Sequence, residues 1–589
     1  MASQYSIGID LGTTNSCLAY VSLSEPEPPV QVLPIPQSTG PDTTENRALL
    51  PSFLYLGEKE SAGNKLLRWI RGDQNHVVGE WARRQAAEAP MRVVAAAKSW
   101  LCHTGVDRRK PILPWNAPAD VPKMSPVEAT RRYLEHFIQT WDEAYPEALF
   151  EDQEVVLTVP ASFDASAREL TRDAALDAGF PKTFVLLEEP QAAVYAWLAD
   201  HHHDWRRQVK EGDVLLVCDV GGGTSDFTLI SVAQEEGQLT LRRLAVGNHI
   251  LVGGDNMDLA LAQLAQATFQ AQGVKVDAWQ SVALWHACRT AKETLLGANA
   301  PAQYPVAVLG RGRNVVGESM TAELDQARVS GALMDGFFPL CRADERPARR
   351  GLSGFKEIGL PFENDPAITR HLAQFLDRQE QAVRPTRVLF NGGVFKSEIF
   401  RQRILEVLAS WFGSNSAPGI LEGNHDFDLA VARGAACYGH TCRRGGIRIR
   451  GGTARSYYVG IETSGPAIPG VSRPLHALCV TPRGMEEGTE IDVPGEPLGL
   501  VVGEAAHFRF FGSTHRTDPV GTVLTEWTED DLIETAPMET TLPAAAGNEG
   551  YVPVTFHAKV TELGILELWC VSAVSPDRWK LEFSVREDV

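Results

Sequence analysis

The chain has 589 residues, of which 44% are hydrophobic, and a formal net charge of -20. This length is too great for a single core, so about three to five folding units are expected. The acidic balance argues against sequence-independent DNA binding by the whole surface, and the absence of an apolar run of about 18 residues argues against a membrane span.

The cysteines and the N-terminus indicate a compartment. The nine cysteines include no C-x-x-C pair, which favours reduced thiols in a reducing cytoplasm. The first strand is expected to begin by about Tyr5, which leaves no room for a signal peptide. A cytoplasmic location is therefore expected.

A short pattern occurs twice, at residues 7–15 and 217–226. Each copy is an apolar run that ends in aspartate and is followed by glycines and hydroxyl residues. Glycines allow a tight turn whose N–H groups bind phosphate oxygens, and an aspartate at the strand end can hold a hydrated magnesium ion. Two such loops that face each other are expected to clamp the polyphosphate of a nucleotide. The alternative is two structural turns, because ordinary hairpins use the same residues.

Residues 1–440 alternate apolar strands with helical patterns, which predicts an α/β domain with two lobes, one after each glycine loop. A helix is expected to start near Ser166, in a capping box with Glu169, and to end at Gly179. Pro190 is expected to open the next helix. The buried strands are expected at residues 155–159, 214–217 and 388–390.

The composition changes after residue 440. Residues 441–456 are rich in arginine and glycine, which predicts a flexible basic linker, with a nucleic-acid-binding arm as the alternative. Residues 457–589 show short strand patterns separated by turn residues and no long amphipathic helix, which predicts a β-sandwich domain.

Several ordered segments together resemble the DnaK-type 70-kilodalton heat-shock chaperone family, within the wider actin-like ATPase fold. The two glycine loops resemble its two phosphate loops. Lys98 falls where the family has its catalytic lysine, and Pro160 and Arg168 resemble its switch proline and the arginine that relays the switch. The other matching segments are residues 47–52, 188–193, 392–393, 428–436, 459–463 and 564–566.

The resemblance implies an ATPase domain that hydrolyses ATP slowly and uses it as a switch, with ATP/ADP and Mg²⁺ as ligands. It implies that residues 457–589 bind unfolded or extended polypeptide through main-chain hydrogen bonds and apolar pockets. A J-domain-type co-chaperone and a nucleotide exchange factor are the implied partners. Neither nucleic acid nor a membrane is expected as a partner.

The resemblance also assigns site residues. Lys98 would orient the attacking water, and Glu189 would act through water on the metal or the nucleophile. Asp219 and Thr224 complete the expected catalytic group, and Asp10 and Asp219 are expected to hold magnesium mainly through its waters. The expected nucleotide-binding residues are Asp10, Gly12, Thr13, Thr14, Asn15, Gly221, Gly222, Gly223, Gly254, Arg289, Lys292, Glu293, Gly392, Gly393, Lys396 and Asp428. Spacing alone leaves open a solvated helix lysine for Lys98 and a mere helix-start carboxylate for Glu189.

Four features depart from the family pattern. Residues 441–456 are basic where the family linker is acidic and leucine-rich, so the usual interdomain route is in question. No helical lid is expected after the last strand, which would speed peptide release. Residues 394–396 replace the usual S-T-R of the adenosine motif, and Arg289 and Glu293 stand in swapped order, so a swapped ion pair is expected to frame the adenine. Residues 341–360 form an arginine-rich insertion, either a solvated loop or a docking site.

Two other functions stay open. One is a nucleotide-gated adaptor that serves a single dedicated protein partner without general chaperone activity, and the basic linker and missing lid favour it. The other is a small-molecule kinase with an actin-like fold, such as a sugar kinase. A kinase needs an aspartate base that faces a substrate hydroxyl, and only Asp219 and Asp226 are candidates.

Overall fold

The structure is a computed structural model of the whole chain. It describes all residues except 1–2, 58–75, 202–203, 236–237, 310–318, 349–358, 361, 380–382, 422, 424–425, 445–448, 451, 464–473, 502–504, 542–550, 562–564 and 584–589. Of the described helices, none is long and apolar enough to cross a membrane.

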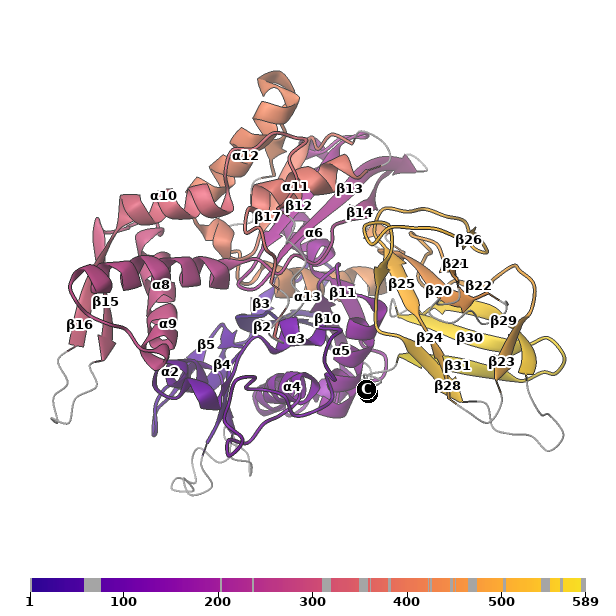
Figure 1. Cartoon of the computed structure of the whole chain (residues 1–589), viewed down its shortest axis with the longest axis horizontal. Coiled ribbons are helices and arrows are strands. Elements are labelled where there is room, and N and C mark those ends of the chain that lie inside the picture. Colours follow the sequence, from indigo (N-terminus) through magenta and orange to yellow (C-terminus); the bar gives the residue numbers. More distant parts are fainter. Residues whose placement is uncertain are drawn as a thin grey trace.

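The first lobe is built on a sheet of strand order β11-β10-β1-β2-β3, with β6 beside β2 (Figure 1). Its strands are β1 (Tyr5–Asp10), β2 (Asn15–Ser22), β3 (Gln31–Val32), β6 (Leu50–Pro51), β10 (Glu154–Val159) and β11 (Val185–Glu188). β1 pairs in parallel with β10 and antiparallel with β2, so the first glycine loop is the turn of the β1–β2 hairpin.

The second lobe repeats this plan in a sheet of order β18-β17-β12-β13-β14-β19. Its strands are β12 (Val214–Val220), β13 (Ser225–Glu235), β14 (Gln238–Val246), β17 (Arg387–Asn391), β18 (Gly419–Ile420) and β19 (Ile449–Arg450). The second glycine loop is the turn of the β12–β13 hairpin, and β12 pairs in parallel with β17. The predicted buried strands are confirmed.

Two helices, α6 (Glu189–Asp200) and α13 (Ala430–Arg444), pack between the two sheets. Their axes approach closely because the helices meet at small residues: a Cβ on Gly434 would lie 1.7 Å from the Ala192 carbonyl oxygen. α13 also lies on β1, where a Cβ on Gly8 would come within 2.3 Å of the Ala432 carbonyl oxygen. The helix pair therefore fixes how the two glycine loops face each other.

The remaining elements of the α/β part surround these sheets. The helices are α2 (Glu80–Glu88), α3 (Ala97–Leu101), α4 (Pro126–Ala144), α5 (Ala165–Ala178), α7 (Trp205–Gln208), α8 (Gly254–Ala271), α9 (Ala278–Leu295), α10 (Gln326–Phe337), α11 (Ile368–Asp377) and α12 (Glu398–Phe412), with short 3-10 turns at Pro90–Arg92, Phe150–Asp152, Gly393–Lys396 and Ser414–Ser416. The strands are β4 (Ile35–Ser38), β5 (Thr44–Arg47), β7 (Leu54–Leu56), β8 (His76–Val78), β9 (Val93–Val94), β15 (Gln303–Leu309) and β16 (Ser319–Asp325).

The start of α5 differs from the prediction. The helix cap is Asp164, whose carboxylate accepts a hydrogen bond of 2.8 Å from the Ala167 N–H, so the predicted capping box of Ser166 and Glu169 is wrong. Ser166 is buried, and its hydroxyl instead accepts a 2.9 Å hydrogen bond from the buried Arg108 guanidinium. The predicted end is confirmed, since Gly179 adopts a φ of 110° there. Pro190 lies in the first turn of α6, as predicted.

Beyond α13 the described residues form strands and no helix. One sheet has the order β26-β21-β20-β25-β27 and the other β22-β29-β30-β31-β28-β24, with β23 beside β29. The strands are β20 (Ser456–Glu462), β21 (Leu475–Thr481), β22 (Glu490–Asp492), β23 (Leu498–Val501), β24 (Ala505–Phe508), β25 (Phe510–Ser513), β26 (Val523–Leu524), β27 (Ile533–Glu534), β28 (Met538–Thr541), β29 (Tyr551–Val560), β30 (Leu566–Ser572) and β31 (Arg578–Phe583). Buried residues of both sheets, such as Val459, Phe510, Val554 and Leu568, share one core.

The predicted flexible linker is wrong for the residues that the structure describes there. Residues 441–444 form the last turn of α13, and β19 pairs in parallel with β14. The Ile449 side chain is buried in the core beside α6, and its N–H donates a 2.9 Å hydrogen bond to the Tyr195 hydroxyl. This apolar anchor holds the segment to the second lobe, although its neighbours are arginine and glycine. Residues 445–448 and 451 lie outside the described part.

The insertion at residues 341–360 is described only at its two ends. Its first residues are partly exposed, and Arg342 and Arg346 pair with Asp344 and Asp377. Residues 349–358 lie outside the described part, as does Gly564 of the tail segment that resembles the family.

The C-terminal sheets contact the α/β part directly (Figure 1). Ile565 joins the core of the first lobe, and Ala454 packs with Ala161 and Val246. The buried Arg455 donates a 2.8 Å hydrogen bond to the Ser162 carbonyl. The contact thus combines apolar packing with buried polar groups.

Candidate functional site

The two glycine loops touch. A Cβ on Gly222 would lie 1.8 Å from Thr14 Oγ1, and one on Gly223 would lie 2.8 Å from Thr13 Cγ2. A side chain at either position would therefore require the threonine side chains of the first loop to move. The structure therefore brings together the loops that the sequence predicts to face each other.

Each loop is held from behind by a neighbouring segment. The Ser52 hydroxyl donates to the Gly12 carbonyl at 2.7 Å, and its N–H donates to the Thr14 carbonyl at 2.9 Å. On the other side, the N–H groups of Gly254 and Asp255 donate to the second loop, the latter to the Gly222 carbonyl at 2.7 Å. These bonds fix both turns before any ligand is bound.

A buried charged cluster lies beside the loops. Lys98 of α3 forms an ion pair with Glu189 at the start of α6, and their side chains are only 11% and 12% exposed. This burial rules out the solvated lysine and the mere helix-start carboxylate. The helix that bears Lys98 begins after Ala96, whose φ of 54° is rare for a residue with a side chain.

Two aspartates complete the cluster, one from each sheet. Asp10 ends β1 and accepts a 3.2 Å hydrogen bond from the Thr158 hydroxyl. Asp219, near the end of β12, accepts a 2.7 Å bond from the Asn391 amide. Both aspartates and Glu189 are therefore placed by strand and helix ends rather than by loose loops.

The cluster holds more acidic than basic side chains, with Asp10, Asp219 and Glu189 around Lys98. Burial, together with the nearby Glu189, raises the pKa of Asp10 to about 7 and that of Asp219 to about 8. Burial opposes the charge on Lys98, but Glu189 and Asp10 outweigh it and raise the pKa of the ammonium above its ordinary value. Such a site favours an added cation.

The donor set fits a hydrated Mg²⁺ and a polyphosphate. Thr14 Oγ1 is buried without a hydrogen-bond partner at the contact of the two loops, as a phosphate-binding hydroxyl would be. Among the described residues, no three His, Cys, Asp or Glu side chains converge closely enough to hold a metal directly. Asp10 and Asp219 would instead hold the ion through its waters, since Mg²⁺ dehydrates reluctantly.

The residues expected around adenosine lie on the second-lobe side. A Cβ on Gly254 would lie 3.1 Å from Lys292 Nζ, 3.5 Å from Val394 Cγ2 and 3.6 Å from Gly222 Cα, so these groups meet. Lys292 Nζ also donates to the Gly254 carbonyl at 2.8 Å, which ties α9 to the start of α8.

The segment expected to bind adenosine, residues 392–393, depends on glycine. Gly392 has a φ of 87°, and a Cβ there would lie 2.4 Å from the Val220 carbonyl oxygen. Gly393 lies against the Asp428 carboxylate, which pairs with Lys396. Thus Gly392, Gly393, Lys396 and Asp428 also come together.

The expected pair of Arg289 and Glu293 is wrong. The Arg289 guanidinium is buried and pairs with Asp255 at 2.6 Å and with Asp258 at 3.0 Å, while Glu293 is exposed. Asp258 also pairs with Lys292 at 2.6 Å. Arg289 pairs with Asp255 and Asp258 of α8 rather than with Glu293, because its guanidinium lies inside the lobe, where leaving it unpaired would cost free energy.

The comparisons with known proteins agree with this geometry. The model of the Hsp70 protein family matches residues 71–329. A curated relative, "Chaperone protein DnaK" of Stenotrophomonas maltophilia (strain R551-3), is 30% identical over 267 residues, which is 43% of this chain and 36% of that protein. Residues 71–329 of the chain are therefore similar to the Hsp70 family. The matched part thus spans little more than a third of the length of this relative.

The α/β part, which contains residues 71–329, accordingly resembles the actin-like domain of that family. The family match includes Lys98, Glu189 and the second glycine loop, whereas the first loop and residues 392–393, which are expected to bind adenosine, lie outside it. The latter two are placed at the site by the fold.

Sequence reasoning missed two residues next to the cluster, Ser162 and His249, both of which contact Asp226. Asp226 follows the second loop, and it contacts the Ser162 hydroxyl and the His249 ring. Asp226 was visible in the loop pattern. No sequence signal distinguishes Ser162 or His249, because only the tertiary fold brings them to the site.

Proposed function

We propose that this chain, which resembles the Hsp70 family, binds and hydrolyses ATP, and that its nucleotide state controls the binding of unfolded or extended polypeptide. The observation that supports this most is the buried Lys98–Glu189 pair, which lies near Asp10 and Asp219 beside the contact of the two glycine loops.

Each group has a role in phosphoryl transfer to water, which depends mainly on positioning and charge. The glycine-loop N–H groups would cradle the phosphates, with hydroxyls from Thr13 and Thr224. Lys98 would orient the attacking water and offset developing charge, a contribution of about 2.7–4 kcal/mol for one such donor. Glu189 holds the ammonium in place. Mg²⁺, held by Asp10 and Asp219 through water, would neutralise phosphate charge.

The site is connected to the C-terminal sheets through neighbouring residues. Glu188, next to Glu189, is buried between two arginines, with Arg168 Nη2 at 2.6 Å from its carboxylate and Arg243 on the other side. Arg243 also bonds to the Gly452 carbonyl, just before the C-terminal sheets. A shift of Glu189 on hydrolysis would therefore move Glu188 and, through Arg243, the Gly452 end of the C-terminal sheets. This route does not require an acidic, leucine-rich linker at residues 441–456.

In this proposal residues 457–589 bind polypeptide, a J-domain-type co-chaperone and an exchange factor are the partners, and the cytoplasm is the location. None of the nine cysteines forms a disulfide bond.

Calorimetry of the full chain with Mg·ATP tests the first step, and absence of binding would refute the proposal. Release of a labelled extended peptide is then compared with ATP and with ADP, and faster release with ATP is expected. Refolding of a heat-damaged reporter enzyme, with a J-domain protein and an exchange factor added, separates a general chaperone from a dedicated adaptor. Positive refolding excludes the adaptor as the main function. ATP consumption without any added sugar excludes the kinase.

A further inference from the structure

Ser162, Asp226 and His249 form a buried polar group beside the ATPase cluster, here called the His249 node. The Ser162 hydroxyl contacts Asp226 Oδ1 and lies 2.7 Å from His249 Nδ1, which is 3.6 Å from the same carboxylate oxygen. The Phe163 ring packs edge-on against the imidazole, with centroids 5.8 Å apart. The imidazole is thus held in one orientation by polar contacts and by packing.

The hydrogen bonds of the node have one consistent direction. Burial opposes ionisation of Asp226, but the nearby His249 imidazole and the hydrogen bond from Ser162 outweigh it and hold the pKa of this carboxyl below its ordinary value. An ionised carboxylate can only accept hydrogen bonds, so the Ser162 hydroxyl must donate its single proton to Asp226. The hydroxyl oxygen must then accept from His249, and Nδ1 therefore carries a proton.

One side of the node faces the nucleotide site. Asp226 lies on β13 directly after the second glycine loop. The charge on Lys98 lowers the pKa of Asp226, and Asp226 in turn helps to raise that of Glu189. A change of charge at the glycine loops therefore reaches the node electrostatically.

The other side of the node is held by the C-terminal sheets. The Ser162 carbonyl accepts the 2.8 Å bond from Arg455, and Asn248 Oδ1 accepts a 3.1 Å bond from the Thr514 hydroxyl. The C-terminal sheets thus contact the node at two points. Arg455, just before β20, binds Ser162, and Thr514, just after β25, binds Asn248 next to His249.

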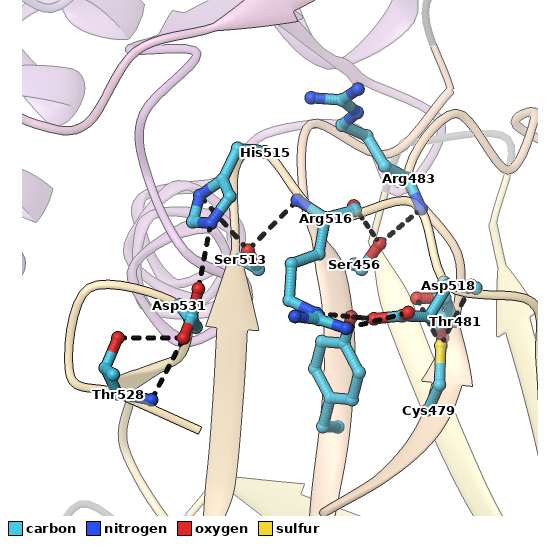
Figure 2. A network of polar contacts seen from close by, with 11 residues as sticks. Ser456, Cys479, Thr481, Arg483, Ser513, His515, Arg516, Asp518, Thr528 and Asp531 are labelled. Carbon is cyan, nitrogen blue, oxygen red and sulfur yellow. Dashed lines mark hydrogen bonds and ion pairs between the residues drawn. The ribbon is translucent and has the colours of Figure 1, made fainter. Parts of the chain in front are cut away.

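The loop that presents Thr514 is itself rigidly fixed. Figure 2 shows Arg516 lying against Asp518, which also accepts a 2.6 Å hydrogen bond from the Tyr458 hydroxyl. The Ser456 hydroxyl donates to the Arg516 carbonyl at 2.8 Å, and Arg483 Nη1 donates to the Thr514 carbonyl at 2.6 Å. A displacement of Asn248 would therefore be transmitted through Thr514 to strand β20 and its neighbours, because the loop between them is held by these hydrogen bonds.

We propose that His249 is a positioning residue that makes docking of the C-terminal sheets depend on the state of the nucleotide site. Through Nδ1 it holds Ser162 against Asp226, and its backbone neighbour Asn248 holds Thr514. Loss of the Nδ1 donor leaves ATP binding intact but frees the Ser162 segment from the second loop. This inference rests on the proposed ATP binding and adds a route separate from Arg168 and Glu188.

The test uses two variants of the full chain. His249→Ala removes the donor, whereas His249→Asn places an amide N–H near the position of Nδ1 and retains it. Hydrogen–deuterium exchange of residues 452–456 and 513–518 is measured with Mg·ATP and with Mg·ADP, and Mg·ATP affinity is measured by calorimetry. His557→Ala is the matched control, because it removes another His–Asp pair that lies within the C-terminal sheets. In that pair His557 Nδ1 lies 2.7 Å from the Asp492 carboxylate.

In the wild type, exchange at these segments is expected to differ between the nucleotides by about tenfold, within the usual range of coupling between sites. His249→Ala should abolish the difference with unchanged ATP affinity, and His249→Asn should restore most of it. His557→Ala should behave as the wild type.

Three results would overturn the inference. These are an unchanged difference in His249→Ala, failure of His249→Asn to restore it, and a wild type that binds Mg·ATP but shows no difference at all. Failure of the wild type to bind Mg·ATP would instead refute the proposed function, and calorimetry distinguishes that case. If His249→Ala does not fold, Ser162→Ala must show the same loss, and a full difference in that variant refutes the node.

Discussion

The Lys98→Ala substitution gives the sharpest test of the ATPase proposal, because the structure predicts two separate consequences. The first is chemical. Lys98 Nζ is the cation beside Asp10 and Glu189, and loss of one such preorganised group costs about 2.7–4 kcal/mol in the transition state, or about 100- to 1000-fold in kcat. ATP binding should survive, since the loops that would hold the phosphates do not depend on Lys98.

The second consequence is structural. Glu189 is 12% exposed and would remain buried without its partner, near Asp10 and Asp219. Breaking a buried ion pair on one side costs about 3–5 kcal/mol. Lys98→Ala should therefore unfold at a lower temperature than the wild type when no nucleotide is present. The double variant Lys98→Ala/Glu189→Gln removes the stranded charge and should regain most of this stability.

The assay separates the two effects. Single-turnover ATP hydrolysis and Mg·ATP calorimetry are measured at a temperature where every variant is folded, and thermal unfolding is measured without nucleotide. The double variant should be nearly as stable as the wild type and still inactive. Unchanged hydrolysis in Lys98→Ala would remove Lys98 from the mechanism, and recovery of hydrolysis in the double variant would show that the loss was only structural.

Three further predictions concern charge, the domain edge and the loops. The folded-state pKa values of Asp10 and Asp219, about 7 and about 8, lie above the ordinary value of 3.8, so the stability they contribute is complete at low pH and is lost as pH rises through 7 and 8. In the absence of Mg·ATP, thermal unfolding should show this decline, and Asp219→Asn should flatten it; an identical pH profile would contradict the assignment. A fragment ending at Arg450 should fold, bind nucleotide and melt at a higher temperature than one ending at His440, which loses the last turn of α13 and β19; equal melting temperatures would mean that these residues add nothing. Gly222→Ala should weaken Mg·ATP binding at least tenfold, because its Cβ would collide with the first loop at 1.8 Å; wild-type affinity in calorimetry would show that the loops need not approach.

The features that the sequence predicted are those set by local backbone chemistry. Three such features can each be recognised within a few consecutive residues. They are the glycine with positive φ at position 179, the proline at the start of α6, and the two apolar strands that end in aspartate and lead into glycine loops. The β-rich pattern beyond residue 456 is equally local, because alternation on strands such as β29 reflects one buried face.

The misjudged features depend on partners that are distant in the chain. Arg289 was assigned to Glu293, four residues away on the same helix, but the acids that hold it come from α8. Ser166 looked like a cap and is a buried partner of Arg108 instead. Residues 441–456 looked flexible by composition, yet one buried isoleucine, Ile449, docks the segment on the second lobe.

By itself, then, the amino-acid order determined the secondary structure, the two phosphate-type turns and the likeness to the Hsp70 family. These follow from dihedral preferences and short periodicities, which act within a few residues. The tertiary structure alone decided which charges meet. Three features show this: the Lys98–Glu189 pair, the raised pKa values of Asp10 and Asp219, and the His249 node. All three arise from burial and from contacts between distant segments of the chain. Burial and long-range contacts cannot be predicted from neighbouring residues in the sequence.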